Sequence, residues 1–208
     1  MHTRNGPQDI TLVGAGGFAR EACNWAEAST FYVSKFIDET GKNKEIFGKK
    51  VYPSFLRSLK KELFFAAVGD PKLRVQLTSR ALDHGLQAAP CIIHPTVVLG
   101  HDVVVCPNSI ICPNAILTTN VYLGPGALVN IGVTIGHDVK VGSFVTFSPG
   151  ANISGNVTIG DLCYIGTNAA IREGVKICDN VVIGMGSVVI KDITEPGVYV
   201  GCPARKMM

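Results

Sequence analysis

The sequence lacks any long run of apolar residues. None approaches the roughly 18 that a membrane-spanning helix requires, and the polar start, Met1–Asp9, has no apolar segment of the signal-peptide kind. Seven cysteines are present, an odd number, and no two of them form a Cys-x-x-Cys pair. These absences argue against membrane insertion and against a disulfide framework. They predict reduced thiols, typical of a cytoplasmic protein.

Strong charge of either sign is also missing. The formal net charge is +3, and charged residues make up 17% of the chain. Proteins that bind nucleic acid through its phosphates usually carry a basic patch, whereas the lysines here are spread out. They include Lys42, Lys44, Lys49, Lys50, Lys60 and Lys61. We therefore expect no nucleic-acid partner. The hydrophobic fraction of 47% suffices for a sizeable core in one or two domains.

What the sequence does contain is a repeat with a period of six. From Ile93 to Val189 every sixth residue is apolar, without a break in phase, and a second series of mostly small residues runs from Val103 to Ser187. Amphipathic helices repeat every 3.6 residues and ordinary strands every 2, so neither fits. The period predicts a parallel β-helix, in which each hexad forms one wall and its apolar residue points into a shared prism.

Before the hexads, strands and helices are expected to alternate. Apolar runs and helical spacing predict strands at Ile10–Val13, Val33–Ile37 and Leu63–Val68, and helices at Glu21–Ser29, Pro53–Lys61 and Lys72–His84. Alternation of this kind is typical of an α/β unit with a parallel sheet. The sequence therefore divides into an α/β domain over residues 1–90 and a β-helix domain over residues 91–208.

A glycine-rich turn, Gly14-Ala15-Gly16-Gly17, separates the first predicted strand from the first helix. Glycines in this place let the backbone approach a phosphate at the helix N-terminus. Asp38-Glu39 follows the second strand and Gly69 the third, so all three segments should meet at the carboxyl ends of the strands. The unit is too short for two mononucleotide-binding halves. It predicts a site for one nucleotide or nucleotide-sugar; the alternative is a structural turn without a ligand.

Two histidines, His101 and His137, occupy predicted corners of the β-helix within Gly-His-Asp sequences. Three walls of six residues make one coil, so these two lie two coils apart on one corner, with Thr119 between them and Gly155 beyond His137. A histidine oriented by a neighbouring carboxylate, such as Asp138, can act as general base in acyl transfer from a thioester. No serine or cysteine nucleophile with its own base is apparent, which favours direct transfer. Spacing alone leaves both histidines open, and a solvated corner histidine is the alternative to either.

These features together resemble a known family. The motifs are Gly14-Ala15-Gly16-Gly17 and Asp38-Glu39 before the hexads, Ile135-Gly136-His137-Asp138 within them, and Val198-Tyr199-Val200-Gly201-Cys202-Pro203-Ala204-Arg205 at the end. In this combination the chain resembles the sialic-acid O-acetyltransferase (NeuD-type) and PglD-type sugar acetyltransferases. The resemblance implies a Rossmann-like half domain followed by a left-handed parallel β-helix. It further implies a homotrimer with active sites between neighbouring β-helices, and acetyl-CoA as co-substrate without a metal.

The resemblance also implies roles for individual residues. The general base is His137 rather than His101, and Asp138 takes the place where the family usually has glutamate. The acetyl-CoA contacts are Thr146, Gly155, Thr167 and Met185, and a backbone N–H near Gly155 would stabilise the oxyanion. Thr146 stands where relatives often carry a second histidine. The nucleotide-sugar contacts are Gly14, Gly16, Gly17, Phe18, Asp38, Glu39 and Gly69, with Phe18 at a place that is often histidine.

The function expected from this resemblance is acetyl-CoA-dependent N-acetylation of a UDP- or GDP-linked amino sugar in bacterial glycan or lipopolysaccharide precursor synthesis. O-acetylation of a sialic acid or another sugar hydroxyl is an alternative within the same fold. Two alternatives belong to other classes. One is a β-helix that binds or assembles without catalysis, and the other is an NAD-dependent enzyme, suggested by Gly14-x-Gly16 and Asp38.

Overall fold

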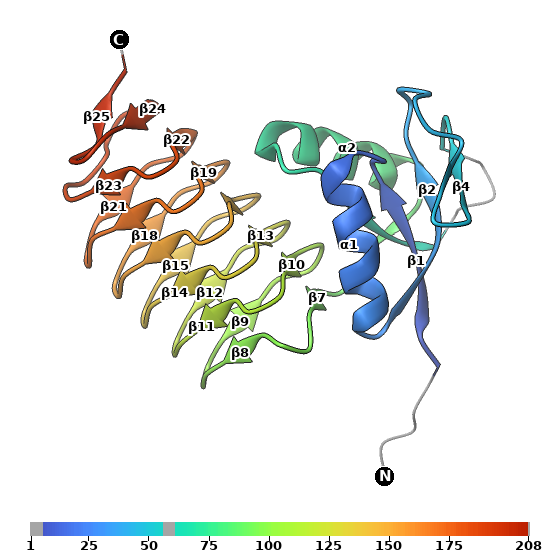
Figure 1. Cartoon of the computed structure of the whole chain (residues 1–208), viewed down its shortest axis with the longest axis horizontal. Helices are drawn as coiled ribbons and strands as arrows, with labels where there is room; N and C mark the ends of the chain where they lie inside the picture. Colours follow the sequence, from blue (N-terminus) through green and yellow to red (C-terminus); the bar gives the residue numbers. More distant parts are fainter. Residues whose placement is uncertain (1–5, 56–60, 208) are drawn as a thin grey trace.

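The computed structural model describes residues 6–55 and 61–207, which form an α/β unit followed by a stack of short parallel strands (Figure 1). The stack runs along the long axis of the molecule, with the α/β unit beside its first coils and the C-terminus at the opposite end. Hydrogen-bonded pairing changes from one architecture to the other between β6 (Gln87–Ala88) and β7 (Ile92–Ile93). The predicted fold class is confirmed.

The α/β unit is built on a six-stranded sheet in the order β3-β4-β2-β1-β5-β6. The further strands are β1 (Gln8–Val13), β2 (Phe31–Ile37), β3 (Glu45–Ile46), β4 (Lys49–Tyr52) and β5 (Leu63–Ala66). Central β1 pairs in parallel with β2 and β5, as the alternation of strands and helices predicts. The antiparallel β3–β4 hairpin was not predicted. The expected helix Pro53–Lys61 falls mainly on residues 56–60, outside the described residues.

Two helices flank this sheet, α1 (Gly17–Ala28) and α2 (Pro71–Asp83). Helix α1 begins four residues earlier than predicted, directly after Gly16. Its buried face carries only alanine and cysteine, which lets the helix approach the sheet closely. Helix α2 begins at a proline, and the Asp70 side chain accepts a hydrogen bond from the Leu73 N–H at 2.7 Å. Neither helix is long and apolar enough to cross a membrane.

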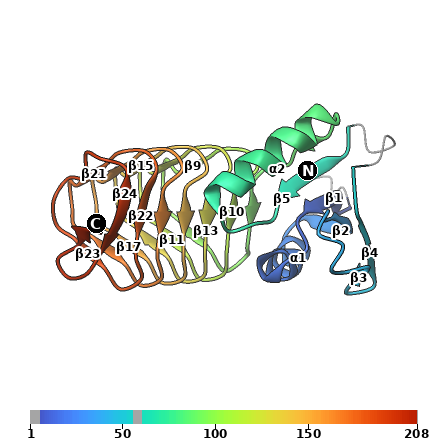
Figure 2. The ribbon, with the colours of Figure 1, turned by 90° about the horizontal axis from the view of Figure 1, so that it is seen from above.

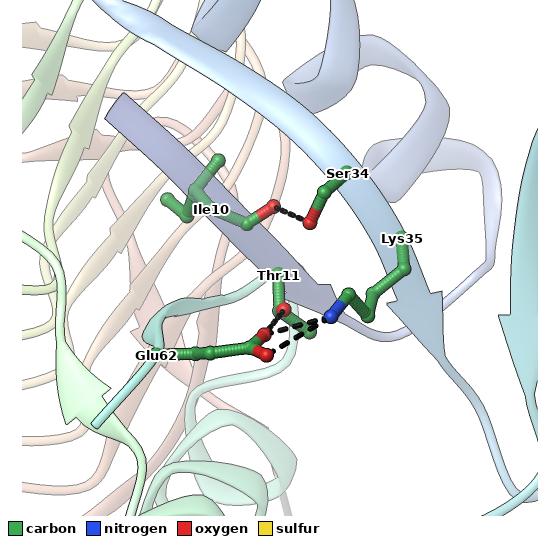
Figure 3. A network of polar contacts seen from close by, with 5 residues as sticks. All are labelled: Ile10, Thr11, Ser34, Lys35 and Glu62. Carbon is green, nitrogen blue, oxygen red and sulfur yellow. Dashed lines mark hydrogen bonds and ion pairs between the residues drawn. The ribbon is translucent and has the colours of Figure 1, made fainter. Parts of the chain in front are cut away.

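A network of polar contacts lies where the pairing of β1 with β2 shifts register (Figure 3). Ile10 pairs with Val33 but Thr11 pairs with Lys35, so Ser34 is the extra residue of β2. The bulge sets Lys35 opposite the buried Thr11, where the Lys35 ammonium contacts Glu62 at 2.8 Å and the Thr11 hydroxyl donates to the same carboxylate at 3.2 Å. The polar side chain inside the sheet thereby gains its hydrogen-bond partner.

The remaining strands form three walls of a β-helix. The first wall comprises β7, β10 (Ile110–Ile111), β13 (Leu128–Val129), β16 (Thr146–Phe147), β19 (Tyr164–Ile165), β22 (Val181–Ile183), β24 (Gly197–Val200) and β25 (Arg205–Lys206). The second comprises β8 (Val98–Leu99), β11 (Ile116–Leu117), β14 (Thr134–Ile135), β17 (Asn152–Ile153), β20 (Ala170–Ile171) and β23 (Val188–Val189). The third comprises β9 (Val104–Val105), β12 (Tyr122–Leu123), β15 (Lys140–Val141), β18 (Thr158–Ile159) and β21 (Lys176–Ile177). Ile110 pairs with Leu128, which confirms the predicted coil of three hexads.

The apolar series fills the prism, except at its open end. From Ile111 to Val189 the inward side chains are buried in one continuous cluster. Leu99, which the period also places inside, is 40% exposed, and Ile93 and Val105 are only partly buried. These residues belong to the first coil, which has no further coil stacked on its outer side. The inward residues of this coil are therefore only partly covered, and Leu99 is exposed at the open end.

The α/β unit packs against the outside of the first wall. Ile92, Ile110 and Leu128 point outward from that wall and share a buried cluster with Ala19 and Ala22 of α1. Viewed from above, α2 also lies alongside the first coils (Figure 2). This packing fixes the carboxyl ends of β1, β2 and β5 relative to the β-helix.

Candidate functional site

His137 lies at the corner between the second and third walls, which we call the histidine corner (residues 101–102, 119–120, 137–138 and 155–156). Its Nδ1 lies 2.8 Å from Oδ2 of Asp138, and both side chains are about half exposed. Asp138 has a φ of 61°, and this left-handed turn directs its carboxylate back toward the ring. The geometry fixes the ring by its Nδ1 and leaves Nε2 for a substrate.

Asn120 holds the other side of this carboxylate. Its Nδ2 donates to Oδ1 of Asp138 at 2.6 Å. This hydrogen bond, together with the contact to His137, lowers the pKa of Asp138 below its usual value. Asn120 was not among the predicted site residues. The signal that could have found it is its position, because it stacks directly beside Asp138 one coil earlier.

Gly155 forms the floor under the imidazole. A Cβ on Gly155 would lie 2.5 Å from both Cε1 and Nε2 of His137, so only glycine allows the ring to rest there. Backbone hydrogen bonds fix the neighbouring coils, because Asn156 N–H donates to the His137 carbonyl at 2.8 Å. The imidazole therefore rests against a backbone that the β-helix itself holds in place.

His101 occupies the same corner without these contacts. Its backbone carbonyl accepts hydrogen bonds from Asn120 N–H at 2.9 Å and from the Thr119 hydroxyl at 3.0 Å. Among the described residues, its ring has no hydrogen-bond or ion-pair partner. Of these two histidines, His137 is the one whose ring contacts a neighbouring carboxylate.

A second candidate site, which is concave, lies at the carboxyl ends of β1, β2 and β5. Gly14, Asp38 and Glu39 line one cavity there, which the apolar side chains of Val13, Ile37, Phe55, Val68, Leu73 and Leu77 complete together with Thr40 and Arg80. Gly14 has a φ of +113°, and a Cβ on it would lie 3.0 Å from Val68, so this crossing of chains requires glycine. An apolar cavity rimmed by a few polar groups suits a nucleotide base.

The acidic residues of this cavity are already engaged. The Asp38 carboxylate accepts hydrogen bonds from the backbone N–H groups of Ala15 and Thr40, each at 2.8 Å. Glu39 forms an ion pair with Arg80, which raises the pKa of that arginine. The sequence suggests Asp38 as an acceptor for a ribose or a base. In the structure its carboxylate also holds the glycine-rich turn in place.

The start of α1 follows directly on the glycine-rich turn, of which Gly14 lines the cavity. Gly16 is its N-cap residue, and no side chain caps the helix. Gly16 and Gly17 are exposed, which leaves room for an anionic group. Phe18 is half buried and packs edge-on against Trp25, with ring centroids 5.9 Å apart.

The residues predicted to contact acetyl-CoA fall into separate places. Thr167 and Met185 stack at the corner between the first and second walls, where Gly186 N–H donates to the Thr167 carbonyl at 2.8 Å and Met185 is 80% exposed. Thr146 lies on the first wall and is buried, with its hydroxyl 2.7 Å from the Gly69 carbonyl. Its side chain is therefore turned toward the α/β unit.

One chain does not bring the two candidate sites together. The α/β unit covers the first wall, whereas the histidine corner joins the second and third walls. In a three-walled prism that corner is opposite the first wall. His137 and the nucleotide cavity therefore lie on opposite sides of the same chain. Among the described residues, no group of three or more His, Cys, Asp or Glu side chains could hold a metal ion.

Two family models match the sequence. The PglD N-terminal domain matches residues 9–81, and the bacterial transferase hexapeptide (six repeats) matches residues 156–191. No curated protein sequence matches the chain. The two models fall on the α/β unit and on the β-helix, respectively.

Solved structures match over nearly the whole chain. The acetyltransferase domain of PglB from Neisseria gonorrhoeae FA1090, in complex with acetyl coenzyme A, is 28% identical, with a TM-score of 0.86, over 97% of this chain and 100% of that one. WeeI from Acinetobacter baumannii AYE is 29% identical, with a TM-score of 0.87, over 96% and 100%. PerB from Caulobacter crescentus, in complex with CoA and GDP-perosamine, is 25% identical, with a TM-score of 0.89, over 99% of each chain. Together with the family models, these structures confirm the resemblance stated from the sequence.

Proposed function

We propose that this PglD-type sugar acetyltransferase transfers an acetyl group directly from acetyl-CoA to the amino group of a nucleotide-linked sugar. The observation that carries the proposal is the His137 imidazole, held by Asp138 on one edge and seated on Gly155. The ligands of two similar proteins support the two substrates: the PglB domain is solved with acetyl coenzyme A, and PerB with CoA and GDP-perosamine.

The chemistry needs one base and one oxyanion donor. The neutral amine of the sugar attacks the thioester carbonyl, and Nε2 of His137 removes its proton. Collapse of the intermediate forms the amide and breaks the C–S bond, and the imidazolium returns its proton to the departing sulfur, which leaves as the CoA thiol. A backbone N–H near Gly155 would stabilise the oxyanion, because that backbone lies close to Nε2 of the ring. Asp138 stabilises the imidazolium that forms.

The nucleotide would occupy the cavity of the α/β unit. Its phosphates suit the exposed N–H groups at Gly16 and Gly17, and its base suits the apolar lining. Asp38 contributes by holding the glycine-rich turn. Acetyl-CoA would lie along the stacked coils past Thr167 and Met185, as the resemblance implies. Each complete site then combines the cavity of one chain with the histidine corner of a neighbour in a homotrimer.

The test is acetyl transfer with purified protein. UDP-, GDP- and CMP-linked amino sugars and free sialic acids are each mixed with acetyl-CoA, and thiol release and product mass are recorded. We expect thiol release and a mass gain of one acetyl group with at least one nucleotide-linked amino sugar. Acetylation of hydroxyls alone would support the O-acetyltransferase alternative. No thiol release with any sugar would leave the non-catalytic alternative, and NADH binding by fluorescence would support the NAD-dependent one.

A further inference from the structure

Arg74 of α2 is a charged side chain buried between the two halves of the molecule. It is 0% exposed and heads the largest fully buried side chains of the described residues. Desolvation lowers its pKa to about 9, which leaves it charged at neutral pH. Among the described residues no carboxylate pairs with it, and Asp70 uses its side chain to cap α2. A buried charge of this kind must be satisfied by other groups.

Backbone carbonyl groups accept hydrogen bonds from all the N–H groups of the Arg74 guanidinium. A guanidinium has five N–H donors, and five carbonyl oxygens accept from this one. Nε donates to Gly126 at 2.8 Å, Nη1 to Val68 at 2.9 Å and Gly69 at 3.1 Å, and Nη2 to Phe144 at 3.0 Å and Val145 at 3.3 Å.

These carbonyls come from two different parts of the molecule. Val68 and Gly69 belong to the loop after β5, and Val68 lines the candidate nucleotide cavity. Gly126 and Phe144 stack on the corner between the third and first walls, where both have positive φ values of 68° and 55°. Arg74 contacts the carbonyls at these turns, and the Val145 carbonyl also accepts the Leu128 N–H of the neighbouring coil at 2.9 Å. The Arg74 side chain thus joins the Val68–Gly69 loop to two coils of the β-helix.

Thr146 reinforces the same joint. Its buried hydroxyl donates to the Gly69 carbonyl, which also accepts from Arg74. We call the contacts of Arg74 and Thr146 with Val68, Gly69, Gly126, Phe144 and Val145 the domain seam. Neither residue reaches open solvent, so the seam does not bind substrate itself.

We propose that Arg74 is a positioning residue, which holds the Val68–Gly69 loop in a fixed place against the β-helix. The inference rests on the proposed function for its catalytic consequence. A sugar bound in the cavity reaches acetyl-CoA only if the cavity and the coils keep their relative positions. Displacement of reacting groups by an ångström can cost about a hundredfold in rate, so a loosened seam lowers kcat.

The structural part of the test is hydrogen–deuterium exchange on the full chain. Arg74→Lys retains the charge but offers three donors on a narrower head, and Arg74→Met offers none. We expect amide exchange over residues 66–70 and 124–128 to rise at least about tenfold in Arg74→Met and less in Arg74→Lys. Exchange over residues 164–189 should stay unchanged. Equal acceleration of all three regions, or none, would overturn the proposal.

The functional part is steady-state kinetics with acetyl-CoA and the sugar accepted by the wild type. We expect kcat to fall about tenfold or more in Arg74→Met, with partial recovery in Arg74→Lys and an unchanged KM for acetyl-CoA. Arg172→Lys, at an exposed arginine of the β-helix, is the matched control. An unchanged kcat in a chain with a loosened seam would overturn the positioning role.

A milder variant covers the case in which both Arg74 variants fail to fold. Thr146→Val keeps the shape of the side chain and removes only the hydrogen bond to Gly69. It should raise exchange over residues 66–70, whereas Thr158→Val on the exposed third wall should not. Unchanged exchange in Thr146→Val would count against the seam. If the wild type transfers no acetyl group, the proposed function fails while exchange still decides whether the seam holds the loop.

Discussion

At the scale of the residue, the candidate base depends on three side chains in line. Asn120 donates to Asp138, and Asp138 contacts Nδ1 of His137. Each member comes from the same corner, so the β-helix backbone sets their spacing. A ring held in this way keeps one tautomer and one orientation, which a solvated corner histidine does not.

Replacing the base should remove most of the activity. His137→Ala deletes the proton acceptor, and we expect kcat to fall by at least about a hundredfold, the usual scale for a lost general base. His101→Ala is the matched control, because it removes a histidine from the same corner two coils away. Acetyl transfer by both variants is measured at saturating acetyl-CoA. A large loss in His101→Ala with little change in His137→Ala would reverse the assignment.

Replacing Asn120 should change the titration of its neighbour. The pKa of Asp138 lies below its usual value, so the carboxylate persists as pH falls and is lost only when pH drops through that lowered pKa. Asn120→Ala removes the hydrogen bond that contributes most to lowering the pKa of Asp138. The pKa of Asp138 should then rise, and the carboxylate should be lost at higher pH. Carbon-13 NMR of the labelled carboxyl group measures this midpoint.

Asn156→Ala provides the control for that titration. Asn156 occupies the same corner one coil after Asp138, but its side chain lies 3.4 Å from Glu173 instead. Its removal should leave the Asp138 midpoint unchanged. Equal midpoints in the wild type and Asn120→Ala would show that the amide does not stabilise the carboxylate.

The sequence could name these residues only in part. The hexad period predicts that residues 18 apart stack on the same corner of successive coils. It therefore predicts where His101, His137 and Gly155 lie. It does not give side-chain directions, which depend on the neighbour one coil away. His137 has Asn120 behind its aspartate and a glycine beneath its ring, whereas His101 lies near the open end of the stack. The choice between them therefore needed the resemblance or the structure.

At the scale of the element, strong periodicity is what made the β-helix predictable. The apolar residues repeat every six positions from Ile93 to Val189, and one inserted or deleted residue would have interrupted this series. The β3–β4 hairpin carries no comparable signal. Its turn uses Phe47 and Gly48, both with positive φ, where the common sequence signal is Asn-Gly or Asp-Gly. A bulky residue in this conformation is not predicted from its chemistry.

A single glycine controls how the coil beneath His137 supports the ring. Gly155→Ala places a methyl group 2.5 Å from Cε1 and Nε2, so the ring must move away. We expect kcat to fall by about tenfold or more, with folding preserved, since Gly155 lies outside the left-handed region. Acetyl transfer and thermal unfolding are measured together. In a His137→Ala background the same change should cost little more, because no ring remains to displace.

At the scale of the whole molecule, the prism separates the candidate base from the candidate nucleotide cavity. The first wall carries the α/β unit, and the histidine corner lies opposite. The hexad period and the strand and helix patterns do not predict this separation, because they do not indicate which wall the α/β unit covers. This separation is the reason for proposing a site shared between the cavity of one chain and the histidine corner of another.

A shared site predicts complementation between two inactive chains. His137→Ala lacks the base but keeps the cavity, and Asp38→Ala loses the anchor of the glycine-rich turn but keeps the base. In mixed trimers formed by co-expression in equal amounts, an intact His137 meets an intact cavity at about one site in four. We therefore expect about a quarter of the wild-type kcat, with sedimentation establishing the trimer. Each variant alone stays inactive, and so does a mixture of trimers purified separately. Co-expressed chains that assemble together yet remain as inactive as the single variants would place both groups in the same subunit's site.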